Sequence, residues 1–363
     1  MKSKPWRVDA HVHLGESDGA GRLLEVAKAA GVARLGIVCV FDRGIVNANP
    51  AAWVAKAEHG KHFYVFGALD HSEYWSGGKV KTPPLAEQVD LLRALGCDGI
   101  KMLENKPATR KQLDLPVDGP YFAPYFARVE ESGFPVLWHV ADPEEFWDPA
   151  LTPKWAQARG WGYDGTFARK EQLYVEVERV LARHPLLKVI FAHFFFLSAD
   201  LPRAAALLER FPNVHLDLAP GIEMLYNMSK NVEAARAFFI KYAGRIVFGT
   251  DLFSGHTLSE GTARVGLVTR WLETADEFRL PPGTDFLLGP PEDGIMRGLH
   301  LPAEAVAQIC RGNYERLAGQ TPRRLDRELA RRECERLAKA VEALTGQKAA
   351  ENHAGKAAAK LAP

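Results

Sequence analysis

The chain has 363 residues, of which 47% are hydrophobic and 25% charged, and its formal net charge is +1 at pH 7. This length suits one parallel α/β barrel or two smaller domains. The near-zero charge offers no electrostatic footprint for nucleic acid or an anionic membrane, so we expect neither as a partner. No apolar run approaches the roughly 18 residues of a membrane span.

Cysteine usage and the first residues bear on where the chain resides. The four cysteines lie far apart, without a CxxC pair, at Cys39, Cys97, Cys310 and Cys334. Cys39 and Cys97 fall in apolar segments, which is typical of small buried residues. The segment Met1–Arg7 holds no apolar signal region and runs straight into a strand pattern. These features predict a reduced, cytoplasmic protein and leave a homodimer open.

Short apolar runs rich in β-forming residues alternate with longer helical patterns from the first residues to about residue 320. Each run is nearly continuous in apolar residues, as burial on both faces of a parallel sheet requires, and Leu35–Phe41 is the clearest example. The runs predict eight strands, near Arg7–His13, Arg34–Phe41, Phe63–Asp70, Asp98–Leu103, Pro135–Val140, Lys188–His193, Val214–Leu218 and Arg245–Asp251.

Between these runs, apolar residues recur at helical spacing. The predicted helices lie near Gly21–Ala30, Pro50–His59, Leu85–Leu95, Tyr121–Ser132, Phe167–Arg183, Pro202–Arg210, Asn231–Tyr242 and Ser259–Phe278. Gly31, Gly96, Gly133 and Gly244 stand where helices are expected to end, just before a strand. Eight strands that each precede a helix predict a (β/α)8 TIM barrel.

Two connections and the C-terminal part depart from the regular alternation. The stretches after strands 4 and 5, Glu104–Gly119 and Ala141–Gly165, are long. In a barrel, such loops lie on the face that carries the active site. Beyond Gly319 the composition becomes rich in Arg, Glu, Ala and Lys. We therefore assign residues 1–319 to the barrel, 320–346 to a helical extension and 347–363 to a disordered tail.

Two histidines end the first predicted strand, in the run Asp9-Ala10-His11-Val12-His13. Residues two apart on a strand project from one face, so His11 and His13 are expected to point together while Val12 packs outward. Imidazoles at this spacing suit one divalent ion at the open end of a barrel. Two histidines on one strand also occur for structural reasons, so the motif needs support from elsewhere in the chain.

Three further polar residues close later strands. His139 ends the fifth strand, His193 the sixth and Asp251 the eighth. Each would be costly within an apolar run unless it were paired or ligated. Because the carboxyl ends of all barrel strands meet at one mouth, we expect these three side chains to converge there with the histidines of the first strand.

The order of these residues resembles the amidohydrolase superfamily, and most closely its amidohydrolase-related group (amidohydrolase family 2). The resemblance runs from about Val8 to Leu317 and includes Gly99-Ile100-Lys101, Ala192-His193, Asn213-Val214-His215-Leu216-Asp217, Gly249-Thr250-Asp251 and Gly312-Asn313-Tyr314. That group contains decarboxylases of aminocarboxymuconate semialdehyde and of resorcylate-type acids, lactonases and other hydrolases. The resemblance implies that a divalent ion, typically zinc, is bound by His11, His13, His139 and Asp251, with His193 beside the metal-bound water.

The residue types define the chemistry of such a site. A bound divalent ion lowers the pKa of its water and supplies hydroxide. We expect Asp251 to take a proton from that water, and His193 to orient the water or polarise the substrate. The leading expectation is a hydrolase of a lactone, amide or ester. The alternative is a non-oxidative decarboxylase of an aromatic or unsaturated acid, and the third is a non-catalytic barrel that binds a small ligand.

Lys101, at the end of the fourth strand, bears on the number of metal ions. Binuclear members of the superfamily carry a carboxylated lysine there that bridges two metals. An uncarboxylated ammonium would repel a cation, so only the carbamate would be a ligand. Many relatives in the amidohydrolase-related group are mononuclear, however. We therefore favour one metal, with Lys101 in an ion pair at the mouth or binding a substrate carboxylate.

Other residues on the same face are candidates for substrate contact. Arg43, after the second strand, would hold a substrate carboxylate bidentately, although a solvated loop arginine explains it equally well. The remaining candidates are His71, Trp138, Glu223 and Tyr226. Trp138 and the tryptophans of the long stretch after the fifth strand suit packing of a lid as well as they suit a substrate wall. Asp217 is expected to support a metal ligand through a hydrogen bond or to be structural.

Overall fold

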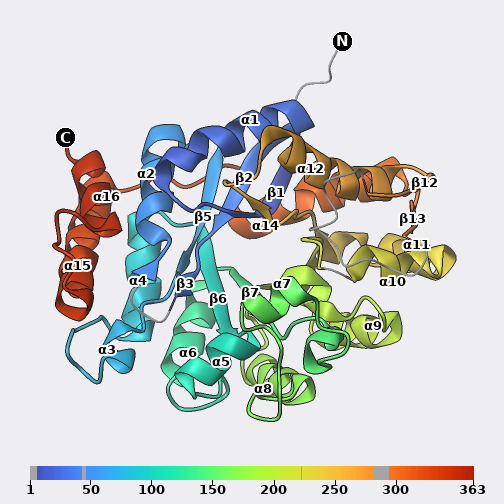
Figure 1. Cartoon of the computed structure of the whole chain (residues 1–363). Coiled ribbons are helices and arrows are strands. Elements are labelled where there is room, and N and C mark those ends of the chain that lie inside the picture. Colours follow the sequence, from blue (N-terminus) through green and yellow to red (C-terminus); the bar gives the residue numbers. More distant parts are fainter. Residues whose placement is uncertain (1–5, 43–45, 222, 281–293) are drawn as a thin grey trace.

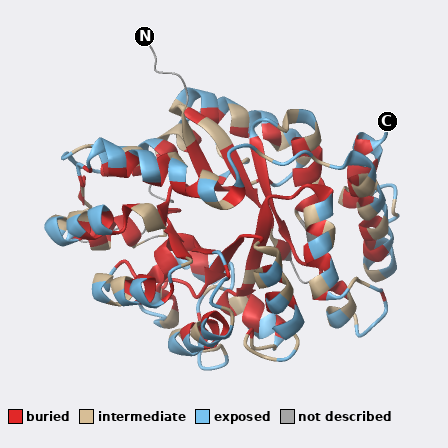
Figure 2. Ribbon diagram, turned by 180° about the vertical axis from the view of Figure 1, so that it is seen from behind, coloured by how far each residue is buried: buried red, intermediate tan, exposed pale blue. Residues whose placement is uncertain are grey.

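A curled parallel sheet ringed by helices forms the centre of the molecule (Figure 1). The structure is a computed structural model that describes residues 6–42, 46–221, 223–280 and 294–363. The strand order is β10-β9-β8-β7-β6-β5-β2-β1-β11. The bounds are β1 (Arg7–His13), β2 (Val32–Val38), β5 (Phe63–Ala68), β6 (Gly99–Asn105), β7 (Val136–Val140), β8 (Val189–Phe191), β9 (Val214–Asp217), β10 (Ile246–Val247) and β11 (Leu252–Phe253). The strands are buried, while the helices expose their outer faces (Figure 2).

Outside this sheet, the described residues form two short antiparallel pairs. They are β3 (Phe41–Asp42) with β4 (Val46–Asn47), and β12 (Glu277–Phe278) with β13 (Met296–Arg297).

The eighth predicted strand, Arg245–Asp251, consists of two pieces that close the barrel. β10 pairs with β9, and β11 pairs with β1. Between the pieces, the Ala10 N–H donates to the Phe248 carbonyl and the Asp251 N–H donates to the His11 carbonyl, both at 2.9 Å. The eighth segment therefore connects the last strand position to the first, and the predicted (β/α)8 fold is confirmed.

The helices lie between successive strands, as predicted. The main ones are α1 (Ala20–Ala30), α2 (Asn49–His59), α4 (Leu85–Leu95), α6 (Ala123–Ser132), α8 (Lys170–Arg183), α9 (Leu201–Arg210), α11 (Val232–Lys241) and α12 (Leu258–Glu273). The shorter ones are α3 (Ser72–Trp75), α10 (Met224–Ser229), α13 (Ala303–Ala307) and α14 (Asn313–Ala318). Gly31, Gly96 and Gly133 follow α1, α4 and α6 with φ of 73°, 90° and 62°, a left-handed conformation that glycine adopts without strain. Gly244 instead lies within a 3-10 turn, Ala243–Arg245.

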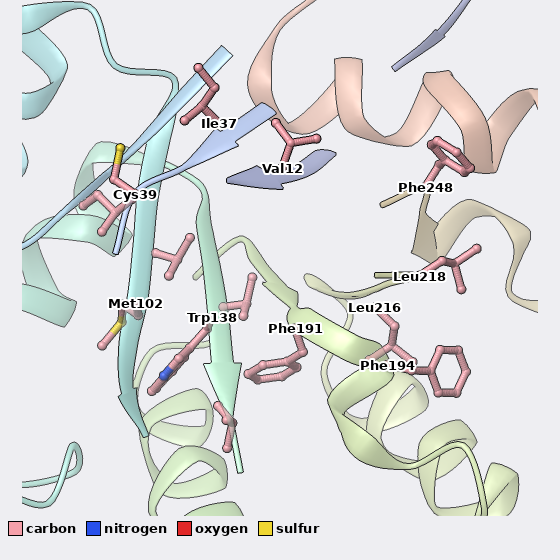
Figure 3. Packing of buried hydrophobic residues seen from close by; sticks show 14 of the residues in the cluster. Val12, Ile37, Cys39, Met102, Trp138, Phe191, Phe194, Leu216, Leu218 and Phe248 are labelled. Carbon is pink, nitrogen blue, oxygen red and sulfur yellow. The ribbon is translucent and has the colours of Figure 1, made fainter. Parts of the chain in front are cut away.

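Two apolar layers flank the sheet. Strand residues such as Val8, Leu137 and Ile190 form a cluster inside the barrel. A larger layer lies between the strands and the helices. Within it, Met102, Trp138 and Phe191 lie side by side on β6, β7 and β8 (Figure 3), where backbone pairing places them opposite one another. Alternate residues of β7 therefore face opposite ways, with Leu137 inward and Trp138 outward.

A bulge in β1 turns the two histidines into the barrel. Asp9 pairs with Leu35, but the next pair is Val12 with Ile37, so β1 spans this interval with one residue more than β2. The extra residue reverses which face the later residues occupy. Ala10, before the reversal, packs in the interior cluster, whereas Val12, after it, packs outside against the helices. This bulge leaves His11 and His13 on the interior face.

The two long connections contain helices of their own. α5 (Pro107–Leu113) follows β6, and the 3-10 turn η2 (Glu144–Trp147) and α7 (Lys154–Ala158) follow β7. We call residues 141–169 the β7 loop. Its aromatic residues form a separate small core around Phe146, Ala156 and Tyr163, with Trp147, Trp155, Trp161 and Phe167 packed against it. The described residues include no helix long and apolar enough to cross a membrane.

The C-terminal part forms two helices that pack beside α2 (Figure 1). α15 (Arg327–Thr345) is the predicted extension. The prediction of a disordered tail over 347–363 was wrong, because α16 (His353–Leu361) forms there, with Asn352 as its N-cap. Its buried residues are Ala354, Ala357, Ala358 and Leu361. These positions recur at helical spacing, so alanines that resemble low-complexity sequence provide a narrow apolar face.

Candidate metal centre

His11, His13 and Asp251 come together at the C-terminal ends of the barrel strands. Each offers one ligand atom, and the three atoms lie within 4.8 Å of one another. Nε2 of His13 is 3.0 Å and Nε2 of His11 is 3.7 Å from Oδ1 of Asp251. The side chains of His13 and Asp251 are 25% and 29% exposed, whereas that of His11 is buried. The group is therefore reached from solvent on the His13 side.

Asp217 determines which nitrogen of His11 faces this group. Nδ1 of His11 lies 2.7 Å from Oδ2 of Asp217, and a carboxylate only accepts, so Nδ1–H donates. Nε2 of His11 is then unprotonated, and it is buried without a hydrogen-bond partner among the described residues. Burial, followed by the nearby Lys101, lowers the pKa of His11 well below its usual range. A neutral, unpartnered imidazole nitrogen beside a carboxylate fits a divalent cation.

Asp251 is an anion with an unusual backbone conformation. Its φ of 54° is left-handed, which is uncommon for a residue other than glycine. Burial by itself raises the pKa of Asp251, but the hydrogen bond from His13 and the charge of Arg264 hold it well below its usual range. The Arg264 guanidinium, from α12, is 3.5 Å from Oδ2. Nothing in the sequence distinguishes Arg264 from other helix arginines.

Asp9 links the segment that carries His11 and His13 to the segment that carries Asp251, through hydrogen bonds from the backbone of both. Its Oδ1 accepts the N–H groups of His11 and Thr250, each at 3.1 Å, and its Oδ2 accepts the Thr250 hydroxyl. One buried carboxylate thus holds both the β1 bulge and the residue that precedes Asp251. The position of Asp9 within the histidine motif was the available sequence signal.

His193 lies between His11 and His139. Its ring centroid is 5.2 Å from that of His11 and 4.8 Å from that of His139. Its Nδ1 is 3.0 Å from the Ala219 carbonyl and therefore donates, which leaves Nε2 unprotonated. Burial lowers the pKa of His193 to about 4. His193 thus presents a neutral acceptor nitrogen.

The turn that carries His193 is strained. Residues His193 to Phe196 have φ of 55°, 56°, 55° and 51°, although none is glycine. A left-handed conformation costs about 1–2 kcal/mol for each such residue. Aromatic packing compensates, because Phe195 stacks on Phe191 with centroids 4.1 Å apart. The Tyr174 hydroxyl also donates to the Phe195 carbonyl. Strain of this kind concentrates at functional sites.

His139 is outside the group of three and is held by Asp142. Its Nε2 lies 3.1 Å from Oδ1 of Asp142, so Nε2–H donates and Nδ1 is unprotonated. Burial, with Lys106 nearby, lowers the pKa of His139 to about 3. Burial alone would raise the pKa of Asp142, but Lys106 and His139 hold it well below its usual range. Sequence reasoning missed Asp142 and Lys106.

Lys101 points into the barrel and forms no salt bridge with any residue that the structure describes. The residue is 1% exposed, and its Nζ has no hydrogen-bond partner among the described residues. Burial lowers the pKa of Lys101 to about 8, against the opposing effect of Asp217 and Asp251. The ion pair expected for Lys101 is therefore absent from the described part of the chain. A buried amine to which no side chain of the described residues is hydrogen-bonded is a candidate for contact with an anionic ligand.

Two predicted substrate residues have partners within the protein instead. Trp138 is fully buried in the outer layer, 5.4 Å from the ring of Phe126, so its prediction as a substrate wall was wrong. Strand alternation places it opposite to His139. His71 has both ring nitrogens engaged, by Glu104 at 2.9 Å and by Tyr121 at 3.2 Å.

The remaining candidates for substrate contact are Glu223, Tyr226 and Arg43. Glu223 precedes α10, and both of its carboxylate oxygens are buried without a hydrogen-bond partner in the described residues. Burial, followed by Glu145, raises the pKa of Glu223 to about 7. Tyr226 is buried within α10. Arg43 lies outside the described residues.

Comparisons with solved structures agree on the architecture. A "putative amidohydrolase" from Staphylococcus aureus has a TM-score of 0.54 and 12% identity, covering 86% of this chain and 99% of that one. A "putative 2-pyrone-4,6-dicarboxylic acid hydrolase" from Pseudomonas putida has a TM-score of 0.50 and 17% identity, covering 88% and 99%. An uncharacterized TIM-barrel protein from Bordetella bronchiseptica has a TM-score of 0.50 and 16% identity, covering 86% of this chain and 98% of that one. Likeness at these identities concerns the fold alone.

Comparison at the level of sequence is more decisive. No curated protein matches the chain significantly. A family model described as amidohydrolase, however, matches residues 8–320, which include all of the barrel strands apart from Arg7 and each residue of the centre described above. The chain belongs to the amidohydrolase family.

Proposed function

We propose that the chain is a metal-dependent hydrolase that acts on a small lactone, amide or ester. The proposal assigns one divalent ion, Zn2+, to His11, His13, His139 and Asp251. The observation that carries it is the convergence of two histidine Nε2 atoms on one Asp251 oxygen. Nε2 of His11 is buried and has no hydrogen-bond partner within the described ranges. Three imidazoles and one carboxylate suit zinc. Membership of the amidohydrolase family supports an enzyme.

Asp251 and His193 have different roles in the proposed hydrolysis. A divalent ion supplies Lewis acidity and lowers the pKa of a water toward neutrality. Asp251, an anion with an exposed edge, accepts the proton of the attacking water and delivers it to the leaving oxygen or nitrogen as the bond to the carbonyl carbon breaks. The unprotonated Nε2 of His193 accepts a hydrogen bond from the nucleophile and orients it.

Lys101 favours a second candidate, decarboxylation of an aromatic or unsaturated acid. Its buried amine lacks a partner among the described residues, and a substrate carboxylate would compensate its charge. The same residue would serve a hydrolase whose substrate carries a carboxylate. A bridging carbamate on Lys101 with two metals is the remaining alternative for this residue.

Metal content and activity should be measured together. We expect about one Zn2+ per chain in the wild type, and a loss of both metal and turnover in Asp251→Asn. Asp276→Asn is a matched control, because Asp276 forms an exposed ion pair with Arg270. Lactones and esters are assayed by proton release, amides by release of the amine, and aromatic and unsaturated acids by CO2 release. Undiminished turnover in verified metal-free protein would refute the proposal.

Three other outcomes would each favour an alternative to the proposed mononuclear hydrolase. Release of CO2 alone would favour the decarboxylase. A metal ratio near two that halves in Lys101→Ala would favour the bridged pair. A metal-loaded protein that is inert to both panels but stabilised by a small metabolite would favour the binding barrel.

The cysteines bear on where the enzyme resides. All four are free and buried, and on this basis we propose that it is cytoplasmic.

A further inference from the structure

Asp142 joins three segments at one carboxylate. It is buried, three residues beyond His139, at the start of the β7 loop. Lys106, after β6, donates to its two oxygens at 2.7 and 2.6 Å. Nε2–H of His139 and the hydroxyl of Tyr163, near the far end of the β7 loop, donate to it as well. Both oxygens of the carboxylate are thus engaged by donors from three segments of the chain.

The bond from His139 selects a tautomer opposite to that of the other histidines. His11 and His193 donate through Nδ1–H and keep Nε2 unprotonated. His139 donates through Nε2–H and keeps Nδ1 unprotonated. Only an unprotonated ring nitrogen ligates a metal ion, and the hydrogen bond at the other nitrogen determines which one that is. If Asp142 moved away, His139 would lose the hydrogen bond that sets its tautomer and helps to orient its ring.

The donors that hold Asp142 belong to the packed β7 loop. The Tyr163 ring is 4.8 Å from Trp147 and 4.9 Å from Phe167, between centroids, within the small aromatic core. The Lys106 ammonium lies 4.3 Å from the ring of Trp161. A displaced loop would carry away the Tyr163 hydroxyl and leave the buried Lys106 without the face of Trp161. The contacts that seat the loop are therefore those that orient His139.

We propose that Asp142 is a positioning residue that couples seating of the β7 loop to metal binding at His139. This inference rests on the proposed function, because it takes His139 to be a ligand. Coupling of two equilibria is reciprocal. A seated loop raises the affinity for the ion, and the bound ion holds the loop in place by the same factor.

Tyr163→Phe isolates this coupling. It removes one hydroxyl and keeps the ring that packs in the aromatic core. We expect the Zn2+ affinity, measured by competition with a chelator, to fall by up to about tenfold, the lower end of the effect of losing a direct partner of a ligating histidine, because Tyr163 acts through Asp142. In the wild type, Zn2+ should slow hydrogen exchange across residues 141–169. In Tyr163→Phe that zinc-dependent slowing should shrink by a similar factor.

Tyr242→Phe is the matched control. The Tyr242 hydroxyl also donates to a carboxylate, that of Glu209, at 2.6 Å on the helical surface. We expect wild-type Zn2+ affinity and a wild-type zinc response of the β7 loop in this variant. Lys106→Gln provides a second approach to Asp142, and it should change both quantities in the same direction as Tyr163→Phe.

The outcomes separate this inference from the proposed function. A purely structural role for Tyr163 would accelerate exchange of the β7 loop equally with and without Zn2+, and that result would overturn the coupling. Wild-type protein that binds Zn2+ without any change in loop exchange would also overturn it, while the proposed function would stand. Wild-type protein that binds no divalent ion would refute both.

Discussion

Nδ1 of His11 lies 2.7 Å from Oδ2 of Asp217, and both side chains are buried. The other oxygen of Asp217 accepts the backbone N–H groups of His193 and Ala219, at 2.7 and 3.1 Å. One carboxylate therefore sets the tautomer of His11 and the start of the strained turn that carries His193. Because its two oxygens have different partners, the orientation of an asparagine amide at this position can be predicted.

Asp217→Asn should present the wrong group to His11. Two backbone donors require the amide oxygen on their side, so the amide NH2 would face Nδ1 of His11 and force the proton onto Nε2. We expect the Zn2+ affinity to fall about 10–100-fold, measured by chelator competition, with turnover at subsaturating zinc reduced in parallel. Unchanged affinity would contradict the role assigned to Asp217.

Lys101→Met should stabilise the protein and impair its function. Methionine fills a comparable volume without an amine that lacks a partner, and removal of an unsatisfied buried polar group is worth about 1–3 kcal/mol. Urea unfolding of the metal-free variant should therefore shift to higher concentrations. Its KM for carboxylate-bearing substrates should rise, while KM for uncharged esters stays close to wild type. A destabilised variant would show that Lys101 has a compensating partner in solution.

Trp138→Ala should weaken the fold without altering the site. The indole is fully buried and packs against Phe126 and Phe191 on the helical side of β7. Truncation of such a side chain costs about 3–5 kcal/mol, to be measured by urea unfolding. Because Trp138 faces away from His139, the KM of the folded fraction should remain at its wild-type value. A raised KM at unchanged stability would restore Trp138 as a substrate contact.

His215 should make the stability of the metal-free protein depend on pH. Burial, with Arg245 and Arg316 nearby, lowers the pKa of His215 to about 3 in the folded chain, against roughly 6.5 when unfolded. Between these values the unfolded chain binds more protons, so stability is lost as the pH falls below about 6.5. His215→Gln should reduce the loss between roughly pH 6.5 and 5 by up to about 2 kcal/mol. The measurement is urea unfolding of both proteins at the two pH values. An equal loss of unfolding free energy in the wild type and the variant would contradict this prediction.

Local sequence determined the barrel and the approximate place of its chemistry. Parallel strands buried on both faces must be nearly continuous apolar runs, so eight such runs identify the strands. Polar residues at the ends of those runs are costly unless they have partners. For this reason His11, His13, His193 and Asp251 stood out, and the structure places them at one mouth of the barrel.

Tertiary structure decided the partners and the orientations. Asp217 is 206 residues from His11, and Tyr163 is 21 residues from Asp142. No periodicity relates residues at such separations. The β1 bulge, the division of the eighth strand and the outward face of Trp138 likewise depend on pairing between strands. The sequence specifies which side chains would be costly to bury alone, but packing of distant segments determines which groups compensate them.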